Sequence, residues 1–259
     1  MILRRITGAF RRQDWFTVAI ETLIVVLGVF LGLQASNWNA DRLARAQADD
    51  LLQRMIVEAE EARADMADYQ DSHAWILDNA LKLSVRLNAT EDCLAMDDEM
   101  KTLILAVGDF PPPRFSLATA NEAIESDSLS IIGSADIRSE VRRMVDEMTF
   151  VERQWQRYVR VKQDSEKAIY TAAGLSLSRD EALKVLPGNE WSGIDQYRLQ
   201  TPEGVCGKPE MVAYASNAAL TEHIYTIFLG EVSEKLDQYA ALLSAYRNNG
   251  HMPDKATTP

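Results

Sequence analysis

The chain has 259 residues, a formal net charge of -12, 12 glycines and 8 prolines. An acidic chain argues against nucleic-acid binding, because that function needs a basic surface to neutralise phosphates. So few helix-breaking residues favour helices over a many-stranded β fold. The length suits one membrane anchor plus one further domain, since domains commonly have about 100–200 residues.

The first segment, residues 1–14, is basic. It holds Arg4, Arg5, Arg11 and Arg12, and its first acid is Asp14. Arginines beside a membrane span mark its cytoplasmic side. We therefore expect residues 1–14 in the cytoplasm and a domain of residues 39–248 on the far side of a membrane that the chain crosses once.

Residues 15–38 are predicted to form the transmembrane helix. Between Thr17 and Leu33 the only charged residue is Glu21. From Trp15 to Trp38 a helix covers about 35 Å at ~1.5 Å per residue, which spans a hydrocarbon core of ~30 Å. Trp15 and Trp38 would then anchor the helix at the two interfaces.

Two other origins of this apolar segment fit less well. A cleaved signal peptide has a shorter apolar core, and a small residue where Leu33 stands. A type IV pilin has a processing Gly where this chain has Trp15. The sequence therefore favours a permanent membrane helix.

Three residues inside the span are candidates for more than anchoring. Gly28 and Gly32 form the G-x-x-x-G spacing that lets two helix backbones approach closely, although an apolar run also acquires such a pair by chance. Glu21 is either a functional ionisable group in the membrane or a side chain that reaches to the cytoplasmic interface. The sequence does not decide between association and chance for the two glycines, or between function and interfacial contact for Glu21.

The stretch Glu21–Asn39 reads ETLIVVLGVFLGLQASNWN. It resembles the membrane-exit signature of a family of uncharacterised bacterial single-pass membrane proteins. In that family a Glu opens the span, a Gly lies midway and the chain leaves the membrane as A-L-Q-x-N-N-W-N. The residues that fit are Glu21, Gly28, Leu33, Gln34, Asn37, Trp38 and Asn39, whereas Gly32 and Ser36 depart from the pattern. The resemblance implies a bacterial protein with this membrane topology and no activity. We therefore expect the span in the bacterial inner membrane and residues 39–248 in the periplasm.

Three long amphipathic helices are predicted beyond the span. No Pro or Gly interrupts the chain between Leu33 and Asn88, so the first helix should continue to about Leu87. Apolar residues recur on it at steps of three and four, as in a coiled-coil seam. These residues are Ala48, Leu52, Met55, Ala59, Ala62, Met66, Tyr69, His73, Ile76, Ala80, Leu83 and Leu87.

The second helix should run from Ser134 as N-cap to Gly174 as C-cap, and the third from Pro209 to a residue before Gly250. The second seam consists of Ile137, Val141, Met144, Met148, Val151, Trp155, Tyr158, Ile169 and Ala172. The third consists of Met211, Tyr214, Ala218, Tyr225, Phe228, Val232, Leu236, Tyr239, Leu243 and Tyr246.

Shorter elements fill the remaining chain. A short helix is predicted at Asp97–Val107, and capping boxes mark helix starts at Thr119–Glu122 and Ser178–Glu181. Phe110–Pro113 is a stiff connector, and residues 249–259 form a flexible tail. The expected fold is all-α, with an N-terminal transmembrane helix that continues into an elongated helical bundle with coiled-coil-like seams.

The two cysteines, Cys93 and Cys206, are expected to form a disulfide if the domain lies in an oxidising compartment. The bond needs Cα atoms within ~7 Å, so the end of the first helix would meet the start of the third. The second helix would then run parallel to the first. The alternative is two free thiols and three long helices that alternate in direction.

We found no catalytic, cofactor-binding or metal-binding motif. His73, His223 and His251 lack a second ligand at metal spacing. The favoured hypothesis is a non-enzymatic interaction or scaffold module, tethered to the lipid bilayer, that self-associates or binds another envelope protein. The alternative is a periplasmic ligand-sensing helical bundle that signals through a membrane partner.

Overall fold

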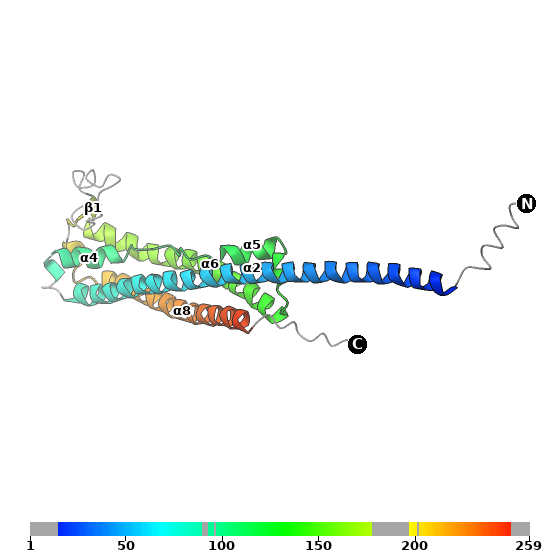
Figure 1. Cartoon of the computed structure of the whole chain (residues 1–259). Helices are drawn as coiled ribbons and strands as arrows, with labels where there is room; N and C mark the ends of the chain where they lie inside the picture. Colours follow the sequence, from blue (N-terminus) through cyan, green and yellow to red (C-terminus); the bar gives the residue numbers. More distant parts are fainter. Residues whose placement is uncertain (1–14, 90–92, 96, 178–196, 201, 250–259) are drawn as a thin grey trace, which may run out of the picture. The chain divides into compact units, whose positions relative to one another are not determined.

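The computed structural model describes residues 15–89, 93–95, 97–177, 197–200 and 202–249. It confirms an all-α protein (Figure 1). The elements in chain order are α2 (Trp15–Asn88), α4 (Asp98–Ala106), α5 (Ala118–Glu125), the 3-10 helix η1 (Ser128–Ile131), α6 (Ala135–Ala173), β1 (Ser176–Leu177), β2 (Tyr197–Arg198), the 3-10 helix η2 (Pro202–Gly204) and α8 (Pro209–Asn248). The predicted segment 1–14, the box at Ser178–Glu181, His251 and the tail from residue 250 lie outside the described residues.

Contacts divide the chain into two units, Met1–Leu52 and Gln53–Pro259, and α2 passes through both. In the first unit the large apolar side chains from Ile20 to Leu33 are all between 39% and 65% exposed. Because of this stretch, α2 is the one helix of the described chain that is long and apolar enough to cross a membrane. The helix also extends without interruption to Asn88, as the absence of Pro and Gly predicts.

The second unit contains a three-helix bundle in which α8 runs antiparallel to both α2 and α6. Residue numbers rise along one helix as they fall along the other in the pairs Arg63–Asp237 and His73–Glu222 (α2 with α8), and Glu147–Lys235 and Ser165–Asn217 (α6 with α8). The last part of α2 is therefore parallel to α6. Residues 107–134, which include α5, return the chain between them.

The first predicted seam forms one side of the bundle core. Every predicted seam residue from Met55 to Leu87 is buried, with at most 7% of its surface exposed. A repeat of three and four residues keeps these side chains on one face of α2, so the pattern alone identifies the core face. Many of these residues are alanines, which let neighbouring helices approach closely.

The seam predicted for the third helix is wrong at Tyr214, which is 38% exposed. Ala215 occupies the core position there instead, whereas Ala218 is buried as predicted, and the step of four from Ala218 leads to Glu222. The predicted seam contains only apolar and aromatic residues. In the structure the heptad positions of α8 also include the charged Glu222.

Three of the predicted helix ends are confirmed. The Ser134 hydroxyl accepts a hydrogen bond from the Ile137 backbone N–H, at 3.3 Å, and so caps α6. Gly174 ends α6 in the left-handed conformation, at φ 61°, where a residue without a Cβ is favoured. Pro209 is the first residue of α8.

The capping box predicted at Thr119–Glu122 is wrong. Helix α5 begins at Ala118, and its N-cap residue, Leu117, makes no side-chain cap. The Glu58 carboxylate of α2 accepts hydrogen bonds from the backbone N–H groups of Thr119, at 2.8 Å, and Ala120, at 3.4 Å. A negative charge at a helix N-terminus also suits the helix dipole, so a residue from α2 supplies the cap that the local sequence seemed to provide.

Cys93 and Cys206 form the predicted disulfide, with their Cα atoms 5.6 Å apart. The backbone N–H of Gly207 donates a hydrogen bond to the carbonyl oxygen of Leu87, at 2.9 Å. Buried residues of α2, α4, α6 and α8 surround the bond, among them Leu83, Met100 and Ile169. The end of α2 and the start of α8 therefore meet, which excludes the alternating order of the three long helices.

Removal of the disulfide should lower the free energy of unfolding by about 2–4 kcal/mol, because the bond closes a long loop in the unfolded chain. The two cysteines are 113 residues apart in sequence. The measurement is thermal unfolding of the wild type and of a Cys93→Ser/Cys206→Ser variant, each with and without a reductant. Reductant should lower the melting temperature of the wild type only. A wild type that melts equally in both conditions would show that the bond does not form.

Candidate functional site

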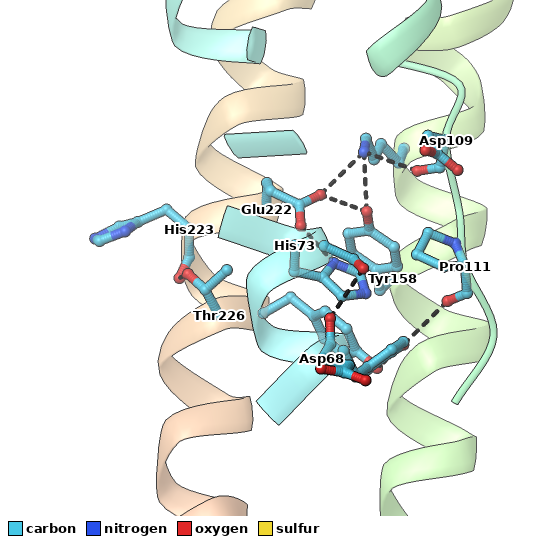
Figure 2. A network of polar contacts seen from close by, with 12 residues as sticks. Asp68, His73, Asp109, Pro111, Tyr158, Glu222, His223 and Thr226 are labelled. Atoms are coloured by element: carbon cyan, nitrogen blue, oxygen red, sulfur yellow. Dashed lines mark hydrogen bonds and ion pairs between the residues drawn. The ribbon is translucent and has the colours of Figure 1, made fainter. Parts of the chain in front are cut away.

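The site is a layer of six polar and aromatic side chains at one level of the bundle, which we call the buried polar layer (Figure 2). Each helix contributes two residues spaced by three or four positions, so that both point to the core. The members are Tyr69 and His73 from α2, Tyr158 and Lys162 from α6, and Glu222 and Tyr225 from α8. All are buried, and the side chains of His73, Lys162 and Glu222 have no exposed surface.

Glu222 lies at the centre of the layer. One carboxylate oxygen, Oε1, is 2.6 Å from His73 Nδ1. The other, Oε2, accepts hydrogen bonds from Lys162 Nζ, at 2.9 Å, and from the Tyr158 hydroxyl. One carboxylate on α8 thus holds groups from both α2 and α6, so it joins the three helices.

The Lys162 ammonium group is fully satisfied. Besides Glu222, its Nζ donates to the Tyr158 hydroxyl, at 2.9 Å, and to the backbone carbonyl oxygen of Asp109, at 3.2 Å. It also lies 5.4 Å from the ring centroid of Phe110. The connector after α4 therefore closes the layer on the side of α6, as Figure 2 shows.

The tyrosines extend the network. The hydroxyl groups of Tyr69 and Tyr225 are 3.1 Å apart, and the Tyr69 hydroxyl also donates to the carbonyl oxygen of Pro111, at 3.1 Å. The rings of Tyr158 and Tyr225 stack at 4.5 Å and 18°. Each ring is held by a hydroxyl bond at one end and by stacking on its face, which fixes its position.

The surroundings shift the pKa values of the ionisable groups. Burial would by itself raise the pKa of Glu222, but the hydrogen bond from His73 and the charge of Lys162 outweigh it, so the pKa lies below its ordinary value. Burial lowers the pKa of Lys162, although the charge of Glu222 opposes the change. Burial, followed by the charge of Glu222, raises the pKa of Tyr158.

His73 has one satisfied and one unsatisfied ring nitrogen. Its Nδ1 faces Glu222, while its Nε2 is buried without a hydrogen-bond partner. The charges of Glu222 and Lys162, which pair at 2.9 Å, offset each other in the layer. The unsatisfied Nε2 lowers the free energy of unfolding by about 1–3 kcal/mol, and the hydrogen bond from Nδ1 to Glu222 offsets part of this loss.

Sequence reasoning found only part of this layer. The predicted seams contain His73 and the three tyrosines of the layer, but the second seam passes over Lys162 between Tyr158 and Ile169. Glu222 was missed, although the step from Ala218 to Tyr225 passes through it at heptad spacing. A charged residue at a core position of a long seam is the signal that would have revealed the layer.

The other predicted site residues lie elsewhere. Gly28 and Gly32 are in the apolar part of α2, and a Cβ at either position would meet no atom within 4 Å. Glu21 is exposed, and Trp38 is 67% exposed. Trp15 begins α2, but its side chain is outside the described part of the structure. These residues belong to the first unit, and the polar layer belongs to the second.

The described residues contain no group of three or more His, Cys, Asp or Glu side chains that could hold a metal ion. Comparison with known proteins finds no matching family model, no matching curated protein and no matching solved structure. The resemblance of Glu21–Asn39 to a membrane-exit signature therefore stays a prediction.

We predict that the effects of replacing Lys162 and Glu222 on the free energy of unfolding are strongly coupled. In Glu222→Gln the buried ammonium group loses its counter-charge, which should cost about 3–5 kcal/mol of unfolding free energy. Lys162→Met should also destabilise the protein. The double variant removes both charges, so its loss should be smaller than the sum of the single losses by about 1–3 kcal/mol. Urea unfolding followed by circular dichroism measures all four proteins.

The control is the exposed pair Arg63–Asp237, which joins α2 to α8 at 2.5 Å. A second cycle with Arg63→Gln and Asp237→Asn should give coupling close to zero, because solvent screens an exposed pair. Equal coupling in the two cycles would contradict the assignment of a special role to the buried pair.

Proposed function

We propose that the protein is a single-pass membrane protein of the bacterial envelope and acts as a non-enzymatic interaction or scaffold module. The observation that carries the proposal is the continuity of α2. This one helix of 74 residues contains both the exposed apolar stretch and one side of the bundle core. A bundle built on such a helix is tethered wherever the apolar stretch is inserted.

The exposure of the apolar stretch supports insertion into a bilayer. The described residues leave its large side chains between 39% and 65% exposed, and their removal from water would be strongly favourable. The open surface at Gly28 and Gly32 supports a close approach by a second span. Glu21 near the start of the span would reach the cytoplasmic interface or pair with a partner there.

Two independent features support the proposed orientation. Arg4, Arg5, Arg11 and Arg12 favour a cytoplasmic N-terminus. The disulfide between Cys93 and Cys206 favours an oxidising compartment for the bundle, because such bonds seldom persist in the cytoplasm. Both features agree on a periplasmic bundle anchored in the inner membrane.

The outer surface of α8 is the proposed contact face. Leu220, Ile224 and Ile227 follow one another at steps of four and three residues, on the side of the helix opposite to Glu222 and Tyr225. They are 57%, 60% and 53% exposed. An exposed apolar stripe on an otherwise well-packed helix is typical of a surface that another protein covers.

A photo-activatable residue at Leu220 or Ile227 should therefore form a covalent adduct in native membranes. The same residue at Arg142, an exposed position on α6, should form none. Ile224→Asp should abolish the adducts, because a charge in the stripe opposes its burial. Equal labelling from Arg142, or no adduct from α8, would contradict the proposal.

The mass of the adduct separates the two kinds of partner. An adduct of two copies that disappears when Gly28 and Gly32 are both replaced by Leu would support self-association. An adduct with a different protein would support a scaffold for another envelope component.

Reporter fusions should confirm the orientation. A reporter that is active only in the periplasm should be active after Pro259 and inactive before Met1. Replacement of the four arginines by Glu should reduce this asymmetry, because the charge bias would be lost. Activity of the N-terminal fusion alone would reverse the proposed topology.

The contacts of α2 favour a second candidate function, ligand sensing. His73 and Tyr69 bond directly to Glu222 and Tyr225 of α8. A ligand that shifted these α8 residues would act on α2, the helix that also contains the candidate span.

A further inference from the structure

A groove of about 320 Å³ lies between α6 and α8, against the outer side of the buried polar layer. Its floor includes the stacked rings of Tyr158 and Tyr225, and its walls include Val161, Ile224 and Phe228. This volume is near the lower limit of ligand sites, which hold about 300–1,000 Å³. A cavity of about 150 Å³ accepts one benzene ring, so the groove has room for about two fused rings.

The floor is rigid before any ligand arrives. The Tyr158 hydroxyl is held by Glu222 and Lys162, and the Tyr225 hydroxyl is held by Tyr69. Each ring is only 4% exposed, so its remaining surface faces the groove. Because the two rings cover each other's faces, they present their edges to the groove. An aromatic ligand can meet these ordered edges in edge-to-face contacts, and little side-chain entropy is lost on binding.

The walls are apolar and uncovered. Val161 is 44% exposed and Ile224 is 60% exposed, while Phe228 packs against Phe150 with ring centroids 5.7 Å apart. Contact with an apolar ligand would remove this surface from water.

The rim carries an unpaired positive charge. Arg157 lines the groove and is exposed, and the described residues provide it with neither a hydrogen bond nor an ion pair. Its neighbours three and four positions away on α6 are Arg153, Gln154, Arg160 and Val161, so no acid lies on this part of the helix face. The Arg157 guanidinium group is the one charged group that lines the groove in the described chain, and it favours an anion at this place.

We infer that the α6/α8 groove binds a small aromatic carboxylate, whose ring system contacts the edges of Tyr158 and Tyr225 and whose carboxylate pairs with Arg157. The guanidinium group offers two parallel N–H donors, which match the two oxygens of a carboxylate. The apolar walls select the ring system and Arg157 selects the charge. This site is distinct from the stripe of α8 that faces a partner protein, although Ile224 borders both.

This inference deepens the second candidate function by naming its ligand class. The link to α2 is short: the floor residues bond to Glu222 and Tyr69, and Glu222 bonds to His73. A ring that presses on the stacked tyrosines therefore acts on hydrogen bonds to α2.

The test uses the full chain in lipid nanodiscs, with empty nanodiscs as the blank. Equilibrium dialysis measures binding of naphthylacetate and of naphthylacetamide, which has nearly the same shape without the charge. The wild type should bind the carboxylate at least about tenfold more tightly, as expected for a charge-assisted hydrogen bond. Arg157→Gln should remove this preference, and Val161→Asp should abolish binding of both compounds.

Arg160→Gln is the matched control, since Arg160 is an exposed arginine one turn further along α6 that does not line the groove. It should change the affinity for naphthylacetate by less than about twofold, because solvent and salt screen a charge outside the site. Equal binding of the two compounds, equal losses in Arg157→Gln and Arg160→Gln, or no binding by the wild type would overturn the inference.

Hydrogen exchange in α2 separates the site from the sensing function. Naphthylacetate should slow exchange of backbone amides around Tyr69 and His73 if binding is transmitted to α2. Binding at Arg157 with unchanged exchange in α2 would leave the ligand site intact and refute ligand sensing.

Discussion

A carboxylate buried in a helical bundle must be matched by donors and a cation at the same level, and the bundle is arranged around this requirement. The Glu222 carboxylate on α8 lies 2.6 Å from His73 Nδ1 of α2 and accepts a hydrogen bond from Lys162 Nζ of α6 at 2.9 Å. A shift of either helix by one heptad would leave a charge alone in the core, which is far more costly than a lost apolar contact. The layer thereby specifies which turns of the three helices face one another, whereas alanine-rich seams are tolerant of such shifts.

Two connections, a disulfide and a proline-containing segment, reinforce this arrangement of the helices. The disulfide between Cys93 and Cys206 joins the end of α2 to the segment before α8. The connector through Phe110 and Pro111 crosses the layer and supplies carbonyl oxygens to Lys162 and Tyr69. Proline stiffens this segment, so the acceptors are held in place at little entropic cost. A segment that resembles a simple linker in the sequence is thus a part of the site.

At the level of the layer, charged side chains lie inside the bundle and apolar side chains lie on its surface. The charged groups of the layer are enclosed and bonded to one another, while apolar side chains of α8 and Arg157 of α6 face outward. The side chains of His73, Lys162 and Glu222 have no exposed surface and bond the three helices to one another. The proposals for a partner and for a ligand both rest on the outer surfaces of α6 and α8.

Local physics made much of the fold predictable. The heptad repeat identified the core face of α2, Ser134 and Gly174 marked the ends of α6, and Pro209 marked the start of α8, because each depends on residues within a turn or two. The disulfide followed from compartment and from the presence of two cysteines. Only tertiary structure paired Glu222 with His73 and Lys162, brought Glu58 to the start of α5 and left Tyr214 outside the core. Those outcomes depend on residues about 60 to 150 positions apart, whose approach is decided by how whole helices pack and not by the chain on either side of them.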